Sequence, residues 1–227
     1  HLDPEYFWLY ACLVIIAFSL FMNMFYSTLI VPLFNKQTPL EDGELKTKIM
    51  EFSKKAGFNI SKIFVIDGSK RSTKANAYFS GIGPKKRIVL YDTLINEMTN
   101  DEILAVLAHE IGHYKHKHIY WSMIAGIIEI GIMFYIFGLF ASSDMLSQAL
   151  GLEKASFHIA LIAFSIIYSP ISSAFAVVSS IFSRKAEYQA DNFASKHGLS
   201  NELISALKKL SSHNMSNLTP HPWVVFM

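Results

Sequence analysis

The stretch His109-Glu110-Ile111-Gly112-His113 decides how this chain of 227 residues is interpreted. Positions i and i+4 share one face of an α-helix, so His109 and His113 can direct imidazole nitrogens at a single ion. Glu110 lies beside the first histidine and can reach a water molecule next to that ion without being a ligand. The pattern predicts a helix that carries two zinc ligands and a carboxylate placed to act as a general base.

The residues that precede this motif favour the required helix. Thr99-Asn100-Asp101-Glu102 has the pattern of a capping box, in which a threonine and a glutamate three residues later satisfy each other's backbone N–H groups. Apolar residues follow at helical spacing and no proline interrupts them. We therefore expect a helix from this capping box to about residue 118.

Working outward, three long apolar segments surround the motif. Residues 7–31 contain no charged side chain, residues 119–141 contain one charged side chain, Glu129, and residues 157–182 contain no Lys, Arg, Asp or Glu. About 20 residues suffice to cross a bilayer as a helix. The alternative, three buried helices of a large soluble core, is disfavoured because uncharged segments of this length are rare in soluble folds. The sequence predicts three membrane spans.

The basic residues predict the topology. Residues 32–118 and 183–227 hold 14 and 5 of the 20 Lys and Arg residues, whereas residues 142–156 hold one. By the positive-inside rule the two basic segments are expected on the cytoplasmic side. We therefore divide the chain into a first transmembrane helix with a short lead (1–31), a cytoplasmic zincin-like region (32–118), a transmembrane hairpin (119–182) and a second cytoplasmic region (183–227).

The third zinc ligand has two candidates. His116 lies three residues beyond His113, but one helix cannot easily wrap three imidazoles around a tetrahedral ion. The metzincin class is excluded, because it requires Gly at 116 and His at 119, where this chain has His116 and Ile119. His116 and His118 are expected instead at the helix end near the lipid headgroups, where the helix dipole favours them.

Glu187 is the better candidate for the third ligand. It follows the third span by five residues, and the predicted hairpin returns it to the surface that holds His113. Asp191 lies four residues later on the same helical face, so one carboxylate can ligate the metal while the other orients a ligand imidazole. An isolated Glu-x-x-x-Asp is usually a solvated face, but its position opposite the motif favours a role in the site.

The region between the first two spans predicts a small α+β domain. Residues 44–56 have the pattern of an amphipathic helix that stops at Gly57. Residues 63–66 and 87–91 predict strands. Residues 76–79 predict a third strand, joined to residues 87–91 by a turn at Gly81-Ile82-Gly83-Pro84. The predicted fold is mainly α: a multi-pass membrane protein with a zincin-like domain that combines a small sheet with the motif helix.

Composition excludes other classes of protein. The net charge of +2 argues against a nucleic-acid binder, and a single cysteine excludes a disulfide scaffold. The expected partners are a peptide or protein substrate and the lipid bilayer.

Four stretches resemble a known family: Asp67-Gly68-Ser69-Lys70-Arg71-Ser72-Thr73-Lys74-Ala75-Asn76-Ala77-Tyr78-Phe79, Lys86-Arg87-Ile88-Val89-Leu90-Tyr91-Asp92-Thr93-Leu94, the zinc motif, and residues 184–193. In order and spacing the chain resembles the integral-membrane zinc CAAX prenyl proteases of type I, including their bacterial relatives. The resemblance implies a gluzincin-type endopeptidase in which His109, His113 and Glu187 hold one zinc ion. It also implies that Glu110 is the general base and that Asp191 orients a ligand side chain without binding the metal itself.

The resemblance also implies how the substrate is bound. Asn76 would contact the substrate backbone from an edge strand to which the peptide adds as a further strand. In eukaryotic members the substrate is a prenylated C-terminal tail. With the cytoplasmic side inferred from charge, a eukaryotic protein is expected in the endoplasmic reticulum membrane. A bacterial relative would lie in the inner membrane, with its zinc site towards the cytoplasm.

The chain departs from the family at both ends. The family has additional membrane helices before the first span, and after the position of Met227 it has a His-Pro segment thought to stabilise the developing oxyanion. His221-Pro222 stands in a different context, and we expect it to be a loop outside the site. We therefore expect this chain to be a C-terminal piece of a longer protein, so whether it is active alone stays open.

Two alternative functions remain. The second enzyme hypothesis, after the leading one of a membrane-embedded zinc endopeptidase that cuts lipidated or hydrophobic peptides, is a membrane quality-control zinc protease similar to HtpX, with unmodified membrane proteins as substrates. The chain would also suit a catalytically silent membrane scaffold that retains zinc to hold its helices together.

Overall fold

The computed structural model describes residues 6–70, 76–80, 86–141, 148, 151 and 157–213. The predicted turn at 81–84 and the predicted loop at His221-Pro222 lie outside these residues. The chain forms two compact units, of which unit 1 comprises residues 1–22 and 119–183 and unit 2 comprises residues 23–118 and 184–227. The chain passes between the units three times, so neither unit is one continuous stretch of sequence.

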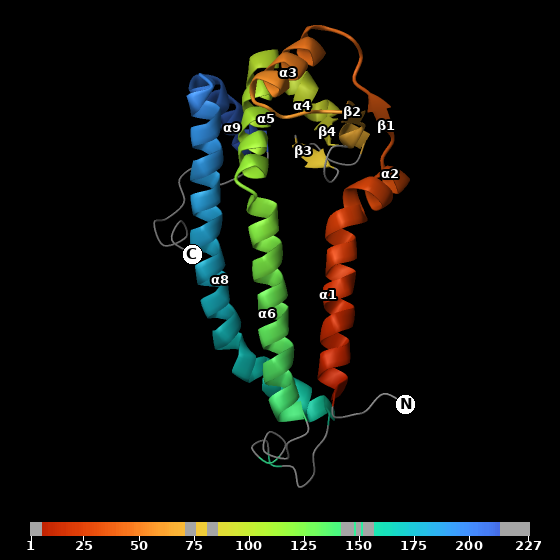
Figure 1. The fold of residues 1–227 in the computed structure, drawn as a ribbon, viewed down its shortest axis with the longest axis vertical. Coiled ribbons are helices and arrows are strands. Elements are labelled where there is room, and N and C mark those ends of the chain that lie inside the picture. The colour runs from red at the N-terminus through yellow and green to blue at the C-terminus, as the bar shows by residue number, and fades with distance from the viewer. Residues whose placement is uncertain are drawn as a thin grey trace. The chain divides into compact units, whose positions relative to one another are not determined.

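Unit 1 is built from long apolar helices (Figure 1). They are α1 (Phe7–Phe25), α6 (His118–Ala141) and the first part of α8 (Phe157–Lys196). Among the described residues, three helical segments are long and apolar enough to cross a membrane: Phe7–Phe34, His118–Phe140 and His158–Lys196. The three predicted spans are therefore confirmed as helices.

Aromatic contacts pack the helices of unit 1. The rings of Trp8 in α1 and Tyr135 in α6 meet edge to face at 5.9 Å, and those of Phe137 and Phe164 at 5.2 Å. Much of the remaining apolar surface is exposed; Val14, for example, is 66% exposed. An exposed apolar surface of this extent is stable in contact with lipid or other membrane segments.

Unit 2 contains a four-stranded mixed sheet in the order β1-β2-β4-β3. The central pair, β2 (Lys62–Ile66) and β4 (Arg87–Tyr91), is parallel and confirms the two predicted strands. The outer strands, β1 (Gln37–Pro39) and β3 (Ala77–Ser80), are each antiparallel to their neighbour. The strand predicted at 76–79 thus begins one residue later, with Asn76 just before it, and β1 was not predicted.

The other described elements of unit 2 are helices (Figure 1). Their bounds are η2 (Tyr26–Ile30), α2 (Val31–Phe34), α3 (Glu44–Lys55), η3 (Gly68–Lys70), α4 (Asp92–Glu97), α5 (Asn100–Lys115), the last part of α8, and α9 (Ser200–His213). Helix α3 ends two residues before Gly57, whose φ of +61° suits glycine at a helix end, as predicted.

Helix α5 begins as predicted and ends earlier than predicted. The Thr99 hydroxyl accepts from the backbone N–H of Glu102, and the Glu102 carboxylate accepts from the N–H of Thr99, which completes the capping box. The prediction that the helix reaches residue 118 was wrong. Lys117 has a φ of +58°, which breaks the helix, and α6 starts afresh at His118.

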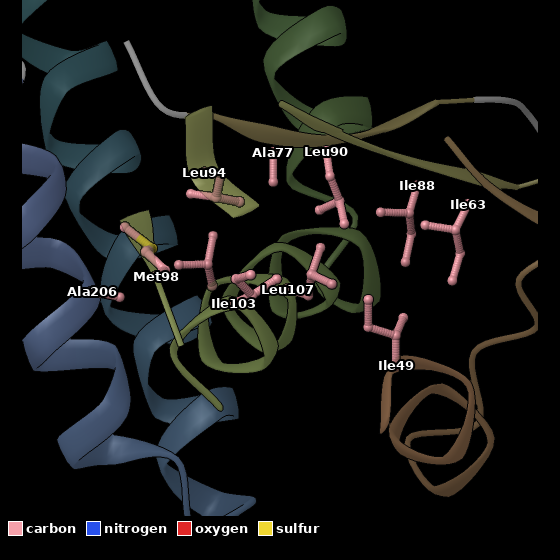
Figure 2. Close-up of a cluster of buried hydrophobic side chains, with 11 residues drawn as sticks. Ile49, Ile63, Ala77, Ile88, Leu90, Leu94, Met98, Ile103, Leu107 and Ala206 are labelled. Atoms are coloured by element: carbon pink, nitrogen blue, oxygen red, sulfur yellow. The ribbon is translucent and has the colours of Figure 1, made fainter. Parts of the chain in front are cut away.

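Two apolar clusters hold α5 from opposite sides. In the first, Ile103 and Leu107 pack with residues of the sheet, α3, α4 and α9 (Figure 2). In the second, Ala105, Ala108 and Ile111 pack with Ala194 of α8, Leu203 of α9 and residues around α3. Because both clusters bury residues of α5, this helix is fixed in the core of unit 2.

Candidate metal centre

His109 and His113 lie one turn apart on α5 and point the same way. Their Nε2 atoms are 3.0 Å apart, and their side chains are 12% and 20% exposed. The i, i+4 spacing thus produces the predicted pair of convergent imidazoles. Because both clusters fix α5, the two rings start from a rigid backbone.

Glu187 of α8 completes the group. Its Oε2 atom lies 3.3 Å from Nε2 of His109 and 3.6 Å from Nε2 of His113. Small residues make this approach possible, because Gly112 of α5 faces the backbone of Ala190 on α8. Among the described residues, His109, His113 and Glu187 form the group of histidines and carboxylates that could hold a metal ion.

The distances within this group test whether the three residues fit a metal ion. Zn–N and Zn–O bonds of about 2.0–2.2 Å in a tetrahedral site place the donor atoms about 3.3 Å from one another. The three observed separations are 3.0, 3.3 and 3.6 Å. Two imidazoles and one carboxylate, with a fourth position open, are also a ligand set of catalytic zinc sites. The residues fit such an ion.

Glu110 has the electrostatics of a proton acceptor. Burial, with a smaller contribution from the negative charge of Glu187, raises the pKa of Glu110 to about 7, although the nearby His109 opposes this effect. A carboxyl group with a pKa near neutrality can take up and release a proton at physiological pH. The predicted base therefore has a suitable acidity.

Asp191 stands behind His109. Its Oδ1 atom lies 2.8 Å from Nδ1 of His109, on the side of the ring opposite the other ligand atoms. A carboxylate there accepts a hydrogen bond from Nδ1–H and leaves the lone pair on Nε2. Asp191 thus lies where the sequence predicted an orienting carboxylate.

His113 has its own partner, which the sequence pattern did not predict. Its Nδ1 atom lies 3.0 Å from Nδ1 of His118, and Nε2 of His118 lies 2.8 Å from Oε1 of Gln189. Burial lowers the pKa of His113, which favours the neutral ring that a metal ligand requires. The expectation that the helix dipole alone accounts for the position of His118 was incomplete, because His118 also contacts His113 and Gln189. His116 is exposed and stacks on His118 at 5.5 Å.

A small pocket adjoins the metal-binding group and has a mixed lining. Its polar residues are Asn76, His109 and Glu110, and its apolar residues are Ala77, Leu94, Val106, Leu203, Leu207 and Leu210. Three of these leucines come from α9, and no sequence pattern connected that helix with the site. Asn76 is exposed, and its Oδ1 atom accepts a hydrogen bond from the N–H of Ala77 at 2.8 Å.

Comparisons with known proteins agree with this geometry. The family model described as "Peptidase family M48" matches residues 39–225, and the model "CAAX prenyl protease N-terminal, five membrane helices" matches residues 3–36. A CAAX prenyl protease 1 homolog of Dictyostelium discoideum is 45% identical over 86% of this chain and 46% of its own length. CAAX prenyl protease 1 of Saccharomyces cerevisiae is 41% identical over 85% of this chain and 46% of its own length.

A solved structure is similar as well. The crystal structure of S. mikatae Ste24p has a TM-score of 0.84 and 38% sequence identity, over 96% of this chain and 54% of that one. The chain spans about half the length of the relatives that it matches. The M48 match covers most of the chain, including the motif helix and the part of α8 that carries Glu187. This multi-pass membrane chain therefore belongs to peptidase family M48.

Proposed function

We propose that the chain forms the metal-binding part of a membrane-embedded zinc metalloendopeptidase. It hydrolyses a peptide bond near the C terminus of a prenylated, CAAX-type peptide or of another hydrophobic peptide. The observation that carries this proposal is the convergence of His109, His113 and Glu187 with Glu110 beside them. The relatives named CAAX prenyl protease 1 support the substrate class.

The proposed chemistry divides between the ion and the protein. One zinc ion on these three residues would supply a Lewis acid that lowers the pKa of a neighbouring water and polarises the substrate carbonyl. Glu110 takes the proton from the attacking water on a carboxylate oxygen, and its pKa of about 7 allows it to release that proton to the leaving amine. Asp191 holds Nδ1–H of His109, so that Nε2 is free to ligate.

The edge strand β3 is the proposed place for the substrate backbone. Among the described strands, β3 pairs with β4 on one side only. A peptide can add as a further strand along such an edge. Asn76, just before β3, would contact its backbone, and the apolar wall from α9 suits an apolar side chain of the substrate.

The location of the site is also a proposal. Its support is the concentration of Lys and Arg in residues 32–118 and 183–227, which by the positive-inside rule favours a site on the cytoplasmic side of the membrane. That membrane is the bacterial inner membrane, or the endoplasmic reticulum if the protein is eukaryotic. The substrate is a peptide or protein, and nucleic acid is not a partner.

Two substitutions test the catalytic assignment in the protein at its full natural length. Glu110→Gln should retain zinc and lose peptide hydrolysis, since only the base is removed. Glu187→Ala should lower the zinc content, because one of three ligands is gone. Persistent hydrolysis by the first variant would reject Glu110 as the base, and unchanged zinc in the second would reject Glu187 as a ligand.

Matched peptides separate the substrate classes. A farnesylated CAAX peptide should be cleaved faster than the same peptide without its lipid. Equal cleavage of both peptides would favour a quality-control protease similar to HtpX. Cleavage of neither, by folded zinc-loaded protein, would favour a scaffold.

A further inference from the structure

The position of His118 is unexpected for a residue five places after His113. On a continuous α-helix, five residues rotate the side chain by about 140° to a different face. Nevertheless the two Nδ1 atoms lie 3.0 Å apart. The turn at His116 and Lys117, with Lys117 at a φ of +58°, brings His118 back towards His113. A lysine is strained in this left-handed conformation, so the rest of unit 2 must hold the turn.

Hydrogen-bond donors and acceptors alternate along this chain of groups. Oε1 of Gln189 is an amide carbonyl oxygen and can only accept, so Nε2 of His118 donates to it. In a neutral imidazole the other nitrogen then accepts, so Nδ1 of His118 receives a hydrogen bond from Nδ1–H of His113. The lone pair of His113 is therefore on Nε2, the atom that faces His109 and Glu187.

We propose that His118 and Gln189 are positioning residues that hold His113 in the tautomer and ring orientation in which Nε2 binds the metal. This inference rests on the proposed zinc site. It makes α8 the support for both histidine ligands, since Asp191 contacts His109 directly and Gln189 reaches His113 through His118. His109 is supported by a carboxylate, that of Asp191, whereas His113 is supported by an imidazole and, through it, an amide.

Zinc affinity, measured without substrate by competition with a chromogenic chelator, tests the proposal. In the protein at its full natural length, His118→Phe and Gln189→Leu should each weaken zinc binding by about 10–100-fold, the usual effect of losing such a partner. Gln189→Glu keeps an acceptor facing His118 and should keep the affinity at or above that of the parent. His116→Phe is the matched control, because His116 stacks on His118 from outside the hydrogen-bonded chain that links His113, His118 and Gln189.

A double variant separates positioning from general stability. If Gln189 acts through His118, adding Gln189→Leu to His118→Phe should weaken zinc binding no further. The unfolding temperature of the metal-free protein should change little in either single variant. Parent-like affinity in folded His118→Phe, or an equal loss in Gln189→Glu and Gln189→Leu, would overturn the proposal.

The same measurement distinguishes this inference from the proposed function. If Glu187→Ala also binds zinc like the parent, the ligand set itself is wrong. If Glu187→Ala loses zinc while His118→Phe does not, only the role of His118 and Gln189 is rejected.

Discussion

At Gly112 helix α5 lies directly against the backbone of α8, and Gly112→Ala is a stringent test of the proposed metal site. A Cβ at this position would lie 2.8 Å from Cα of Ala190, 3.0 Å from Cβ of Phe193 and 3.1 Å from the carbonyl oxygen of Ala190. Carbon atoms in contact prefer about 3.5–4.0 Å. Two of these three neighbours are backbone atoms, so no side-chain rotation relieves the overlap.

The magnitude follows from these distances. Relief of the overlap requires α5 and α8 to separate locally by roughly 0.7–1.2 Å, whereas metal sites tolerate ligand displacements of about 0.2 Å. Overpacking costs about 1–3 kcal/mol, and the better helix propensity of alanine returns about 1 kcal/mol. We expect up to about 2 kcal/mol of destabilisation and a loss of zinc affinity of at least about tenfold.

Chelator competition and thermal unfolding of the metal-free protein measure the two effects separately. Gly126→Ala and Gly131→Ala on α6 are matched controls, because among the described residues no atom outside their own helix lies within 4 Å of the added Cβ. They should bind zinc like the parent and be no less stable. A Gly112→Ala protein with parental zinc affinity and an unchanged or higher unfolding temperature would refute the reasoning.

Three further predictions concern residues around the site. Burial would raise the pKa of Glu102, but hydrogen bonds from Lys209, Ser205 and the Thr99 N–H outweigh it and lower the pKa to about 2. Because the pKa of Glu102 is lower in the folded state, its ionised carboxylate stabilises the fold above pH 4.5, and this contribution is lost as the pH falls towards 2. In thermal unfolding, the stability of the parent should therefore fall more steeply with acid than that of Glu102→Gln. Asp191→Asn should weaken zinc binding by about 10–100-fold in the chelator assay, and parental affinity would exclude its orienting role. Lys117→Gly should raise the free energy of unfolding by up to about 1 kcal/mol and keep the zinc affinity, because glycine adopts a φ of +58° freely. Denaturant titration measures the change in the free energy of unfolding, and a destabilised variant would contradict the strain assigned to Lys117.

The sequence predicted the elements whose signal is local. The capping box at Thr99, the apolar spans and the pair His109 and His113 depend on spacings within one helix, and all three appear as expected. The convergence of Glu187 with these histidines could also be anticipated, because a membrane hairpin must return the chain to the side that it left.

Features that depend on long-range packing escaped prediction. The leucines of α9 line the pocket only because that helix packs against α5 in the core. The role of His118 required a helix break at Lys117, a residue type that gives no local signal for a positive φ. Strand β1 is three residues long and includes a proline, which is a poor strand pattern.

The order of the metal-binding side chains along the chain has a consequence for biogenesis. His109 and His113 precede two of the three membrane-capable helices, α6 and α8, whereas Glu187 lies near the end of α8, beyond its apolar part. The two histidines are therefore synthesised first, and the carboxylate can approach them only after two more spans have been inserted into the bilayer. A nascent chain whose third span fails to insert leaves Glu187 on the wrong side of the membrane. Only a chain with the correct membrane topology can then bring all three side chains to one metal ion.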